Sequence, residues 1–488
     1  HALGLAERVR AEDNTDSGTM QLKNILGFAV GPVATAALGL ITLPIIAWIF
    51  PPPDLGRLNV LQISISFFLL LSVLGLDQAY VREYHEVTNK KQLLKLCFLP
   101  GFVFLCGLAV IGVALAEEFS SLLYSDSDPR LFWMTLAAFF ISYISRFLSL
   151  ILRMQERGWA YSASQVLPKI VQLLLVVSLT LTAYERNFLL LHGVVLCSLF
   201  TVLLCFVWNA RAEWAGAFAE KTDFRQLKQL FKFGLPLVFS GLTYWGLAAT
   251  STIALRLWSP LDELAVYSVA KSFAGAAFVF QSVFTVVWAP VVYKWVAEGA
   301  DMRIVESVTQ QALAVVCVII ALSGTLSWIC DLLLPNQYSA VKYILLCLLI
   351  QPLLYTLSEV TCVGIAITRR TVYSIVIAVA ALLVNLILSY VLVPSFGAAG
   401  AASANAIAFA VFFVARTEVS VRIWRLFPRT KLYVSTLLLL GGTLVTASLG
   451  FDASNAVHVA WFFVLLFCVL FFNKEWTVLY QALRARKL

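Results

Sequence analysis

Charge is scarce in this sequence. Only 13% of its 488 residues are charged and 61% are hydrophobic, whereas soluble globular proteins have about 25% charged and about 45–50% apolar residues. Histidine is rarer still, with four residues, and no histidine or cysteine cluster has the spacing of metal ligands. Nine cysteines occur without a CxxC pair, so we expect buried, inert thiols. The composition excludes a soluble domain, and the residues call for no cofactor.

Two nucleotide-related functions lack their sequence signals. No GxxxxGK[ST] phosphate loop is present, so ATP hydrolysis in this chain is not expected to drive its activity. The net charge is +8, but the basic residues fall in short loops between apolar runs. Such placement carries information on membrane topology and does not form the continuous basic surface of a nucleic-acid-binding protein.

Apolar runs of membrane-spanning length recur along the whole chain. A span needs about 20 residues, and runs bounded by charge, Pro or Gly predict an all-α polytopic membrane protein with fourteen transmembrane helices. The expected spans are 24–50, 58–84, 92–116, 130–152, 160–184, 187–210, 231–257, 262–292, 304–330, 339–366, 371–393, 398–421, 431–449 and 456–479.

Basic residues alternate between the two sides of these spans. One set of loops carries 24 of them, and the other carries only four: Arg57, Arg130, Arg186 and Lys342. Because basic loops stay in the cytoplasm, the alternation predicts cytoplasmic N- and C-termini. We expect a multi-pass protein of the bacterial inner membrane.

An internal repeat divides the chain. "GFAVGPVATAALG" opens the first span and "FKFGLPLVFSGLT" opens the seventh. Parallel repeats of six helices predict two lobes with a cavity between them. The expected segments are a tag remnant or disordered lead at 1–20, an N-lobe at 21–210, a cytoplasmic inter-lobe loop at 211–230, a C-lobe at 231–425, and two extra helices with a tail at 426–488.

Ionisable residues inside the spans are the candidate functional groups, since each costs about 2.5–3.5 kcal/mol at a helix centre unless paired or hydrated. The cations outnumber the acids, which favours an anionic substrate, and phosphate suits Arg and Lys best. We expect a pyrophosphate or acidic sugar to be bound by Arg146, Arg153, Lys169, Arg256 and Lys271.

Other intramembrane residues have alternative interpretations. Sugar hydroxyls could contact Gln165, Gln172, Gln281 and Asn385. Asp77 and Glu359 could carry a coupling H⁺ or Na⁺, or could form structural ion pairs, including with Lys169. Arg153 and Arg256 lie near helix ends, where a long side chain can reach the headgroups instead of a substrate.

Four stretches resemble a known family. "GLDQAYVREYHE" (75–86), "FKFGLPLVFSGLTYW" (231–245), "VYSVAKSFAGAAFVFQSVFTVVWAPVVYKW" (266–295) and "NLILSYVLVPSFGAAGAASANAIA" (385–408) resemble segments of Wzx-type polysaccharide (O-antigen) flippases. These belong to the polysaccharide transporter family of the MOP (MATE-like) superfamily. The resemblance covers about residues 21–488. One departure is "AATSTIALRLW", which lacks the Asp-Arg pair that relatives often carry late in helix 7 and places Arg256 further on.

The resemblance implies a MATE-like two-lobe bundle that moves lipid-linked oligosaccharide by alternating access. Its substrate would be an undecaprenyl-pyrophosphate-linked repeat unit used in O-antigen, lipopolysaccharide or similar polysaccharide biosynthesis. The last two helices would border a groove for the lipid tail. Expected partners are this substrate, membrane lipids and the polysaccharide polymerase machinery. We expect a monomer that binds no nucleic acid.

Three alternatives remain open from the residues alone. A lipid II flippase would need the same headgroup chemistry. A MATE-type cation or drug antiporter would need a dominant acid in its cavity, which the charge count disfavours. A membrane-embedded enzyme, such as a polymerase or ligase, would usually need a large outer loop, and no outer loop exceeds about fifteen residues.

Overall fold

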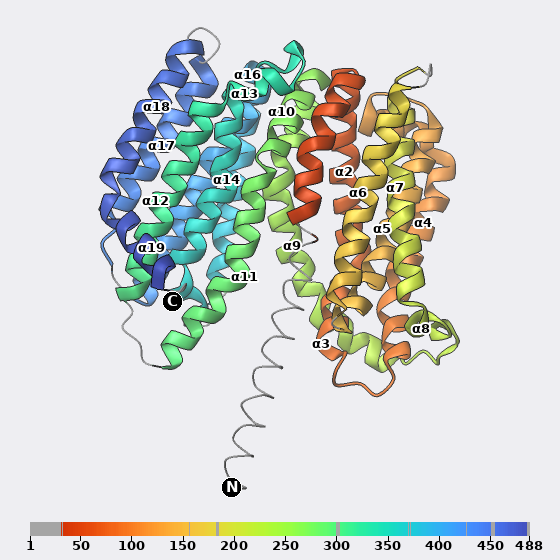
Figure 1. Ribbon diagram of the computed structural model, residues 1–488. Helices are drawn as coiled ribbons and strands as arrows, with labels where there is room; N and C mark the ends of the chain where they lie inside the picture. The colour runs from red at the N-terminus through yellow and green to blue at the C-terminus, as the bar shows by residue number, and fades with distance from the viewer. Residues whose placement is uncertain are drawn as a thin grey trace, which may run out of the picture. The chain divides into compact units, whose positions relative to one another are not determined.

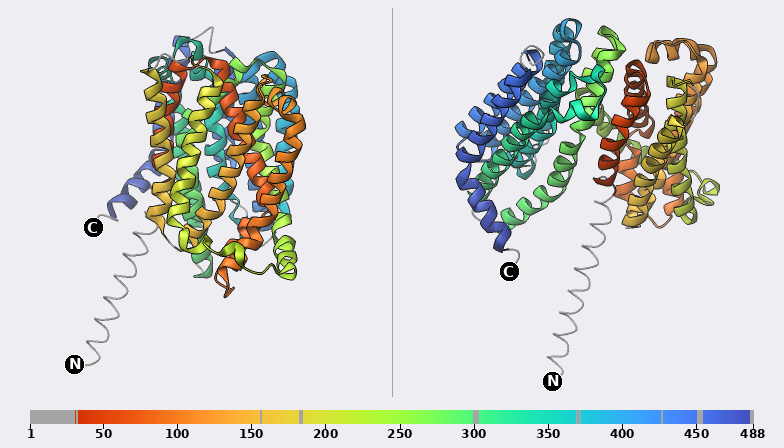
Figure 2. Two further views of the ribbon diagram at one scale, coloured as in Figure 1. Left: turned by 90° about the vertical axis from the view of Figure 1, so that its right-hand side faces the viewer. Right: turned by 45° about the horizontal axis from the view of Figure 1, so that its top comes forward.

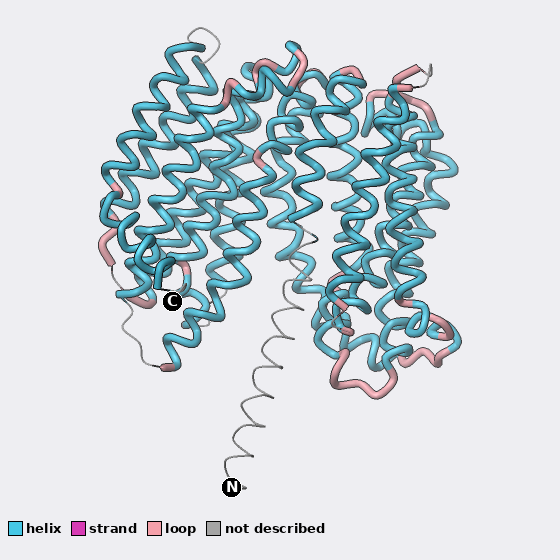
Figure 3. The backbone as a smooth tube through the Cα atoms, viewed as in Figure 1, coloured by secondary structure: helices cyan, strands magenta, loops and turns pink. Residues whose placement is uncertain are grey.

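A computed structural model describes residues 31, 33–155, 157–181, 185–298, 303–368, 370, 372–425, 427–449 and 454–485. Over these residues the chain is helical and contains no strand (Figure 3). The all-α membrane class is therefore confirmed. The lead expected at 1–20 and the beginning of the first expected span lie outside the described residues.

The described chain divides into two compact units. One unit takes in the chain as far as Thr42 together with Leu61–Gly241, and the other comprises Leu43–Val60 and Leu242–Leu488. These borders fall inside helices rather than in the loop 211–230, because a single helix, α9 (Phe224–Trp258), runs from one unit into the other. The lobe borders inferred from the sequence remain a prediction.

The first unit is a bundle of antiparallel helices in which α5 packs on α4, α6 and α7 (Figure 1). Its elements are most of α2 (Pro52–Val73), α3 (Leu76–Glu83), α4 (Lys90–Tyr124), α5 (Pro129–Met154), α6 (Gly158–Thr180), α7 (Phe188–Asn209), α8 (Arg211–Trp214), the 3₁₀ turn η1 (Ala217–Ala219) and the first half of α9 (Phe224–Trp258). Its core is aromatic, with Phe98, Tyr143 and Phe147 in mutual contact.

The second unit is centred on α14, which packs against α10, α11, α12, α16 and α17. Its elements are the rest of α9, α10 (Leu261–Phe273), α11 (Gly275–Ala297), α12 (Arg303–Leu326), α13 (Ile329–Leu333), η2 (Asn336–Tyr338), α14 (Val341–Thr361), α15 (Val363–Ile367), α16 (Val372–Ile423), α17 (Thr430–Leu449), α18 (Ser454–Phe471) and α19 (Asn473–Ala485). Helices α12, α17 and α18 lie side by side (Figure 2).

The count of fourteen spans is not confirmed. Ten helices of the described chain are long and apolar enough to cross a membrane, and the bent pair α10 and α11 would make an eleventh. The first and last expected spans coincide with the shorter apolar helices Val33–Ile49 and Ala456–Phe471. The spans expected at 371–393 and 398–421 both fall in α16, a 52-residue helix broken at Gly397.

Two breaks interrupt these helices at residues with positive φ. Leu74 and Gly75, at φ 53° and 70°, separate α2 from α3, and a Cβ on Gly75 would overlap the carbonyl oxygen of Gly234 in α9. Gly397, at φ 49°, breaks α16 against the side chain of Glu263. Only glycine adopts this conformation readily and also leaves room for such contacts.

Candidate functional site: charged groups of the membrane helices

Arg146 in α5 pairs with Asp77 in α3. Arg146 donates to Oδ2 of Asp77 from Nη2 at 2.5 Å and from Nε at 3.2 Å. The carboxylate also accepts the backbone N–H of Gln78 at 2.8 Å, because Asp77 lies in the first turn of α3, where a negative charge is favoured. The arginine side chain keeps 32% exposure. The first unit thus neutralises its deepest arginine internally.

Lys169 in α6 has no carboxylate partner among the described residues. Its Nζ donates to Oε1 of the buried Gln172, one turn further along the helix, at 3.1 Å. The two acids considered as its partners, Asp77 and Glu359, each pair with an arginine. Gln165 is half-buried on the same helix, and its backbone carbonyl accepts from the Thr35 hydroxyl at 3.5 Å.

Lys271 near the end of α10 is the corresponding unpaired cation of the second unit. It is half-buried, and its Nζ reaches only the Ala248 carbonyl of α9, at 3.5 Å, and the Tyr267 ring, at 6.0 Å. No carboxylate of the described chain lies within ion-pair distance. One turn before it, Ser268 accepts a short hydrogen bond, 2.5 Å, from Asn59.

Two further arginines lie closer to helix ends. Arg153, at the last turn of α5, is exposed, as expected for a side chain that reaches the headgroups. Arg256, at the last turn of α9, is half-buried and close enough to Arg57 for their charges to interact. Arg57 itself pairs with Asp54 at 2.7 Å.

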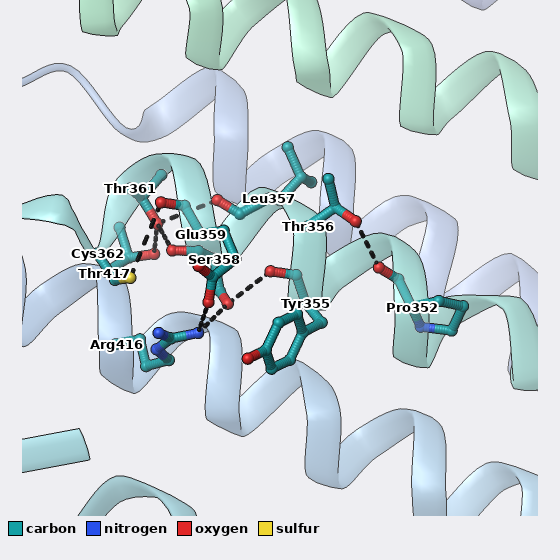
Figure 4. Close-up of polar contacts among 10 residues, drawn as sticks. All are labelled: Pro352, Tyr355, Thr356, Leu357, Ser358, Glu359, Thr361, Cys362, Arg416 and Thr417. Atoms are coloured by element: carbon teal, nitrogen blue, oxygen red, sulfur yellow. Dashed lines mark hydrogen bonds and ion pairs between the residues drawn. The ribbon is translucent and has the colours of Figure 1, made fainter. Parts of the chain in front are cut away.

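A second buried ion pair, missed by the sequence analysis, joins Arg416 in α16 to Glu359 in α14 (Figure 4). Nη1 of Arg416 donates to Glu359 Oε1 and to Ser358 Oγ, both at 2.8 Å. The guanidinium also lies 5.1 Å from the ring centroid of Phe412 and 5.4 Å from that of Tyr355. Arg416 lies near the end of the expected span 398–421, in a run that ends with further charges, so its sequence position suggests the membrane interface rather than a buried pair. Its partner Glu359 is 57 residues away in the sequence, so no i, i+3 or i, i+4 spacing indicates the pair.

The amides proposed to contact sugar differ in their freedom to do so. Asn385 is fully buried, donates to the Leu247 carbonyl at 3.1 Å and accepts from Ser389 at 3.2 Å. Both the NH₂ group and the carbonyl oxygen of its side-chain amide are therefore hydrogen-bonded within the protein. Gln281 hydrogen-bonds the Tyr244 hydroxyl, and its buried Oε1 has no partner among the described residues.

An apolar groove of about 530 Å³ runs along α17 and α18 against α12. Apolar side chains dominate its lining, which includes Leu438, Leu439, Val445, Val464 and Phe467. Trp461 is fixed in its wall by a 2.9 Å hydrogen bond from Nε1 to Thr446 Oγ1. A groove bordered by the last two helices is the feature that the family resemblance implies for a lipid tail.

These observations describe a helical membrane protein with charged side chains inside its spans. Its membrane helices hold two internally neutralised arginines and two lysines without acidic partners, and no group of three or more His, Cys, Asp or Glu side chains in the described chain could hold a metal. The fold matches solved transporters. The lipid II flippase MurJ, in an inward closed conformation, aligns at TM-score 0.67 and 14% identity over 93% of this chain and 99% of MurJ.

A multidrug resistance MATE family transporter of the MOP superfamily, in an inward-facing conformation, aligns at TM-score 0.51 and 16% identity over 82% of this chain and 94% of that one. At such identities the likeness concerns the fold alone. Residues 21–296 match the model of the family described as "Polysaccharide biosynthesis protein", so the chain belongs to that family. Comparison with curated proteins gives no match. Family and fold thus agree on a multi-pass membrane protein of the polysaccharide biosynthesis family.

Proposed function

We propose that this protein is a flippase that moves undecaprenyl-pyrophosphate-linked oligosaccharide, an O-antigen or similar repeat unit, from the inner to the outer leaflet of the bacterial inner membrane. The polysaccharide biosynthesis family supports the substrate class. In such a cycle the polar headgroup would pass through the protein by alternating access while the prenyl tail stays in lipid. Both termini would be cytoplasmic, and the polymerase machinery would receive the product.

The observation that carries this proposal is the pair of unneutralised lysines. Lys169 and Lys271 lie in membrane helices without a carboxylate within ion-pair distance in the described chain. An ammonium group in that environment is costly unless water or an anion accompanies it. A diphosphate headgroup would supply that anion during transport and would not be retained permanently.

The two arginine pairs refine the roles expected from the sequence. Arg146 would reach a diphosphate only by exchanging Asp77 for it, which would free the carboxylate. That exchange makes Asp77 a candidate for taking up H⁺ or Na⁺ during the cycle. Glu359 is enclosed with Arg416, so it suits a structural role better. Arg153 and Arg256 would meet the headgroup near the membrane surfaces.

The groove along α17 and α18 supports a substrate with a long hydrocarbon tail. Its lining is apolar and its volume, about 530 Å³, accommodates several isoprene units. A drug or organic cation would have no need of such a groove and would meet unpaired lysines of its own sign. The MATE-type antiporter is therefore the weaker alternative. Lipid II shares both the diphosphate and the prenyl tail, so it remains the second candidate.

Transport by the purified protein in proteoliposomes separates these substrates. Fluorescent undecaprenyl-pyrophosphate-linked oligosaccharide, lipid II and an organic cation would be compared, with externally added enzyme or quencher reporting which leaflet holds the label. We expect the oligosaccharide to flip fastest. Faster flipping of lipid II would favour the second candidate, and movement of the cation alone would overturn the proposal.

A further inference from the structure

A second apolar groove lies in the first unit. Its volume is about 370 Å³, and all ten of its lining residues are apolar or aromatic. They come from the start of α4, the last turns of α5 and α7, and the segment after α7. Leu99, Phe102, Phe147, Leu148 and Phe218 are among them. The groove therefore lies at the membrane side that carries the basic loops.

An adjoining hollow of about 580 Å³ continues this groove and is more polar. The two share Val207 and Trp214, and the Trp214 indole donates to the Val207 carbonyl at 3.0 Å. Arg211 and Asn209 line the second hollow. Within one unit, a wholly apolar groove thus adjoins a hollow lined partly by Asn209 and Arg211, which we call the polar mouth.

The polar mouth is positively charged. The guanidinium of Arg211 lies 4.7 Å from the Trp208 ring centroid, and Arg157 donates to the Asn209 carbonyl at 2.7 Å. Both arginines are exposed, and neither forms an ion pair with an acid of the described chain. Glu213, two residues after Arg211, accepts a hydrogen bond from Gln155 at 3.0 Å.

The aromatic residues match the depth of a membrane surface. Trp208 is 70% exposed, and Phe218 is 52% exposed. Exposed tryptophans gather where headgroups meet hydrocarbon, and basic pockets at that level bind anionic lipid headgroups. In a bilayer, an open apolar groove next to that belt is filled by hydrocarbon rather than water.

We infer that this groove and its mouth form a binding site for one anionic phospholipid of the surrounding bilayer. An acyl chain would occupy the groove beside Leu99 and Phe218. The phosphate and its anionic headgroup would lie at the mouth, bound by Arg157 and Arg211. The site differs from the groove proposed for the substrate tail, which lies in the second unit along α17 and α18.

Native mass spectrometry of the detergent-purified protein with added phosphatidylglycerol tests the site. The variant R157Q/R211Q removes the headgroup ligands and should weaken retention about tenfold, since each basic residue contributes substantially to anionic lipid binding. The variant R225Q/R422Q removes the same charge from two exposed arginines elsewhere and should retain the lipid as the wild type does. Equal retention by both variants, or equal loss, would overturn the inference.

A second pair of variants tests the groove independently of charge. L99W fills the groove, whereas V103W places the same ring on a neighbouring position of α4 that is 60% exposed and does not line it. We expect L99W alone to lower phosphatidylglycerol retention. Equal effects of the two variants would contradict the site. Displacement of the bound lipid by stoichiometric undecaprenyl diphosphate would show the occupant to be substrate and would also overturn the inference.

Discussion

The two buried arginine–carboxylate pairs differ in how completely each unit encloses its charges. Arg416 in the second unit retains 11% side-chain exposure, with Glu359, Ser358 and two aromatic rings around it. Arg146 in the first unit retains 32% side-chain exposure, and within the described part of the chain its guanidinium hydrogen-bonds only Asp77. Similar chemistry thus occurs once in an enclosed and once in an open setting.

The difference in exposure between the two arginines indicates which ion pair can change partners. A pair surrounded by protein loses its whole solvation if one member leaves, so it holds α14 and α16 together in a fixed arrangement. A partly open pair can exchange its carboxylate for water or a phosphate at lower cost. We therefore expect the Arg416–Glu359 pair to contribute stability, whereas the Arg146–Asp77 pair suits the exchange proposed above.

Removal of Arg416 should have the largest effect on stability. Arg416→Ala leaves Glu359 buried without a counter-charge, and breaking a buried pair this way costs about 3–5 kcal/mol. Thermal unfolding of the purified protein in detergent would measure the loss. The double variant R416Q/E359Q, which removes both charges, should recover much of it. If Arg416→Ala were as stable as the wild type, the enclosed pair would not contribute the stability we expect of it.

Substitution of the glycines at the two helix breaks should cause the next largest loss of stability. Gly397→Ala and Gly75→Ala place a side chain at positive φ and against Glu263 or Gly234, respectively. Such strain costs about 1–3 kcal/mol. Gly39→Ala is the matched control, since nothing lies within 4 Å of its new Cβ, and in a helix the change should stabilise slightly. Equal melting temperatures for all three would contradict the strain argument.

Removal of Arg146 should destabilise the protein less than removal of Arg416. Arg146→Ala leaves Asp77 with the Gln78 N–H and better access to water, so we expect a loss of roughly 1–2 kcal/mol. The same unfolding measurement applies, with both variants in one detergent. If Arg146→Ala proved as costly as Arg416→Ala, the open and enclosed settings would not differ in the way we infer.

Arg153 should matter least for stability. The side chain is exposed at the end of α5, and surface substitutions of this kind change stability by about 0.5 kcal/mol or less. Arg153→Ala should therefore melt with the wild type. A large loss would indicate a partner that the exposure of Arg153 does not suggest.

The helical membrane class could be predicted from the sequence because hydrophobic runs and basic loops report directly on the bilayer. The division into two compact units has no local signal at one of its borders, since α9 continues from Gly241 to Leu242 without interruption. The sequence does place a break between 393 and 398, where the structure bends α16 at Gly397, but the full count of fourteen spans stays a prediction.

Candidate charges could be found from the sequence, but not their partners. Any ionisable residue in an apolar run is conspicuous, which is why Arg146, Lys169 and Lys271 were identified. Whether each is neutralised depends on contacts between helices far apart in the chain, such as Arg146 with Asp77. The resulting distinction between paired arginines and unpaired lysines therefore required the structure.

The flipping rate of Lys271 variants is the most direct test of whether this unpaired lysine binds the substrate. In proteoliposomes containing labelled lipid-linked oligosaccharide, Lys271→Gln should lower the flipping rate at least about tenfold, the effect of losing one charged contact of roughly 1.4 kcal/mol or more. Lys271→Arg should retain most activity, and both proteins should melt near the wild type. Wild-type flipping by folded Lys271→Gln would contradict the account.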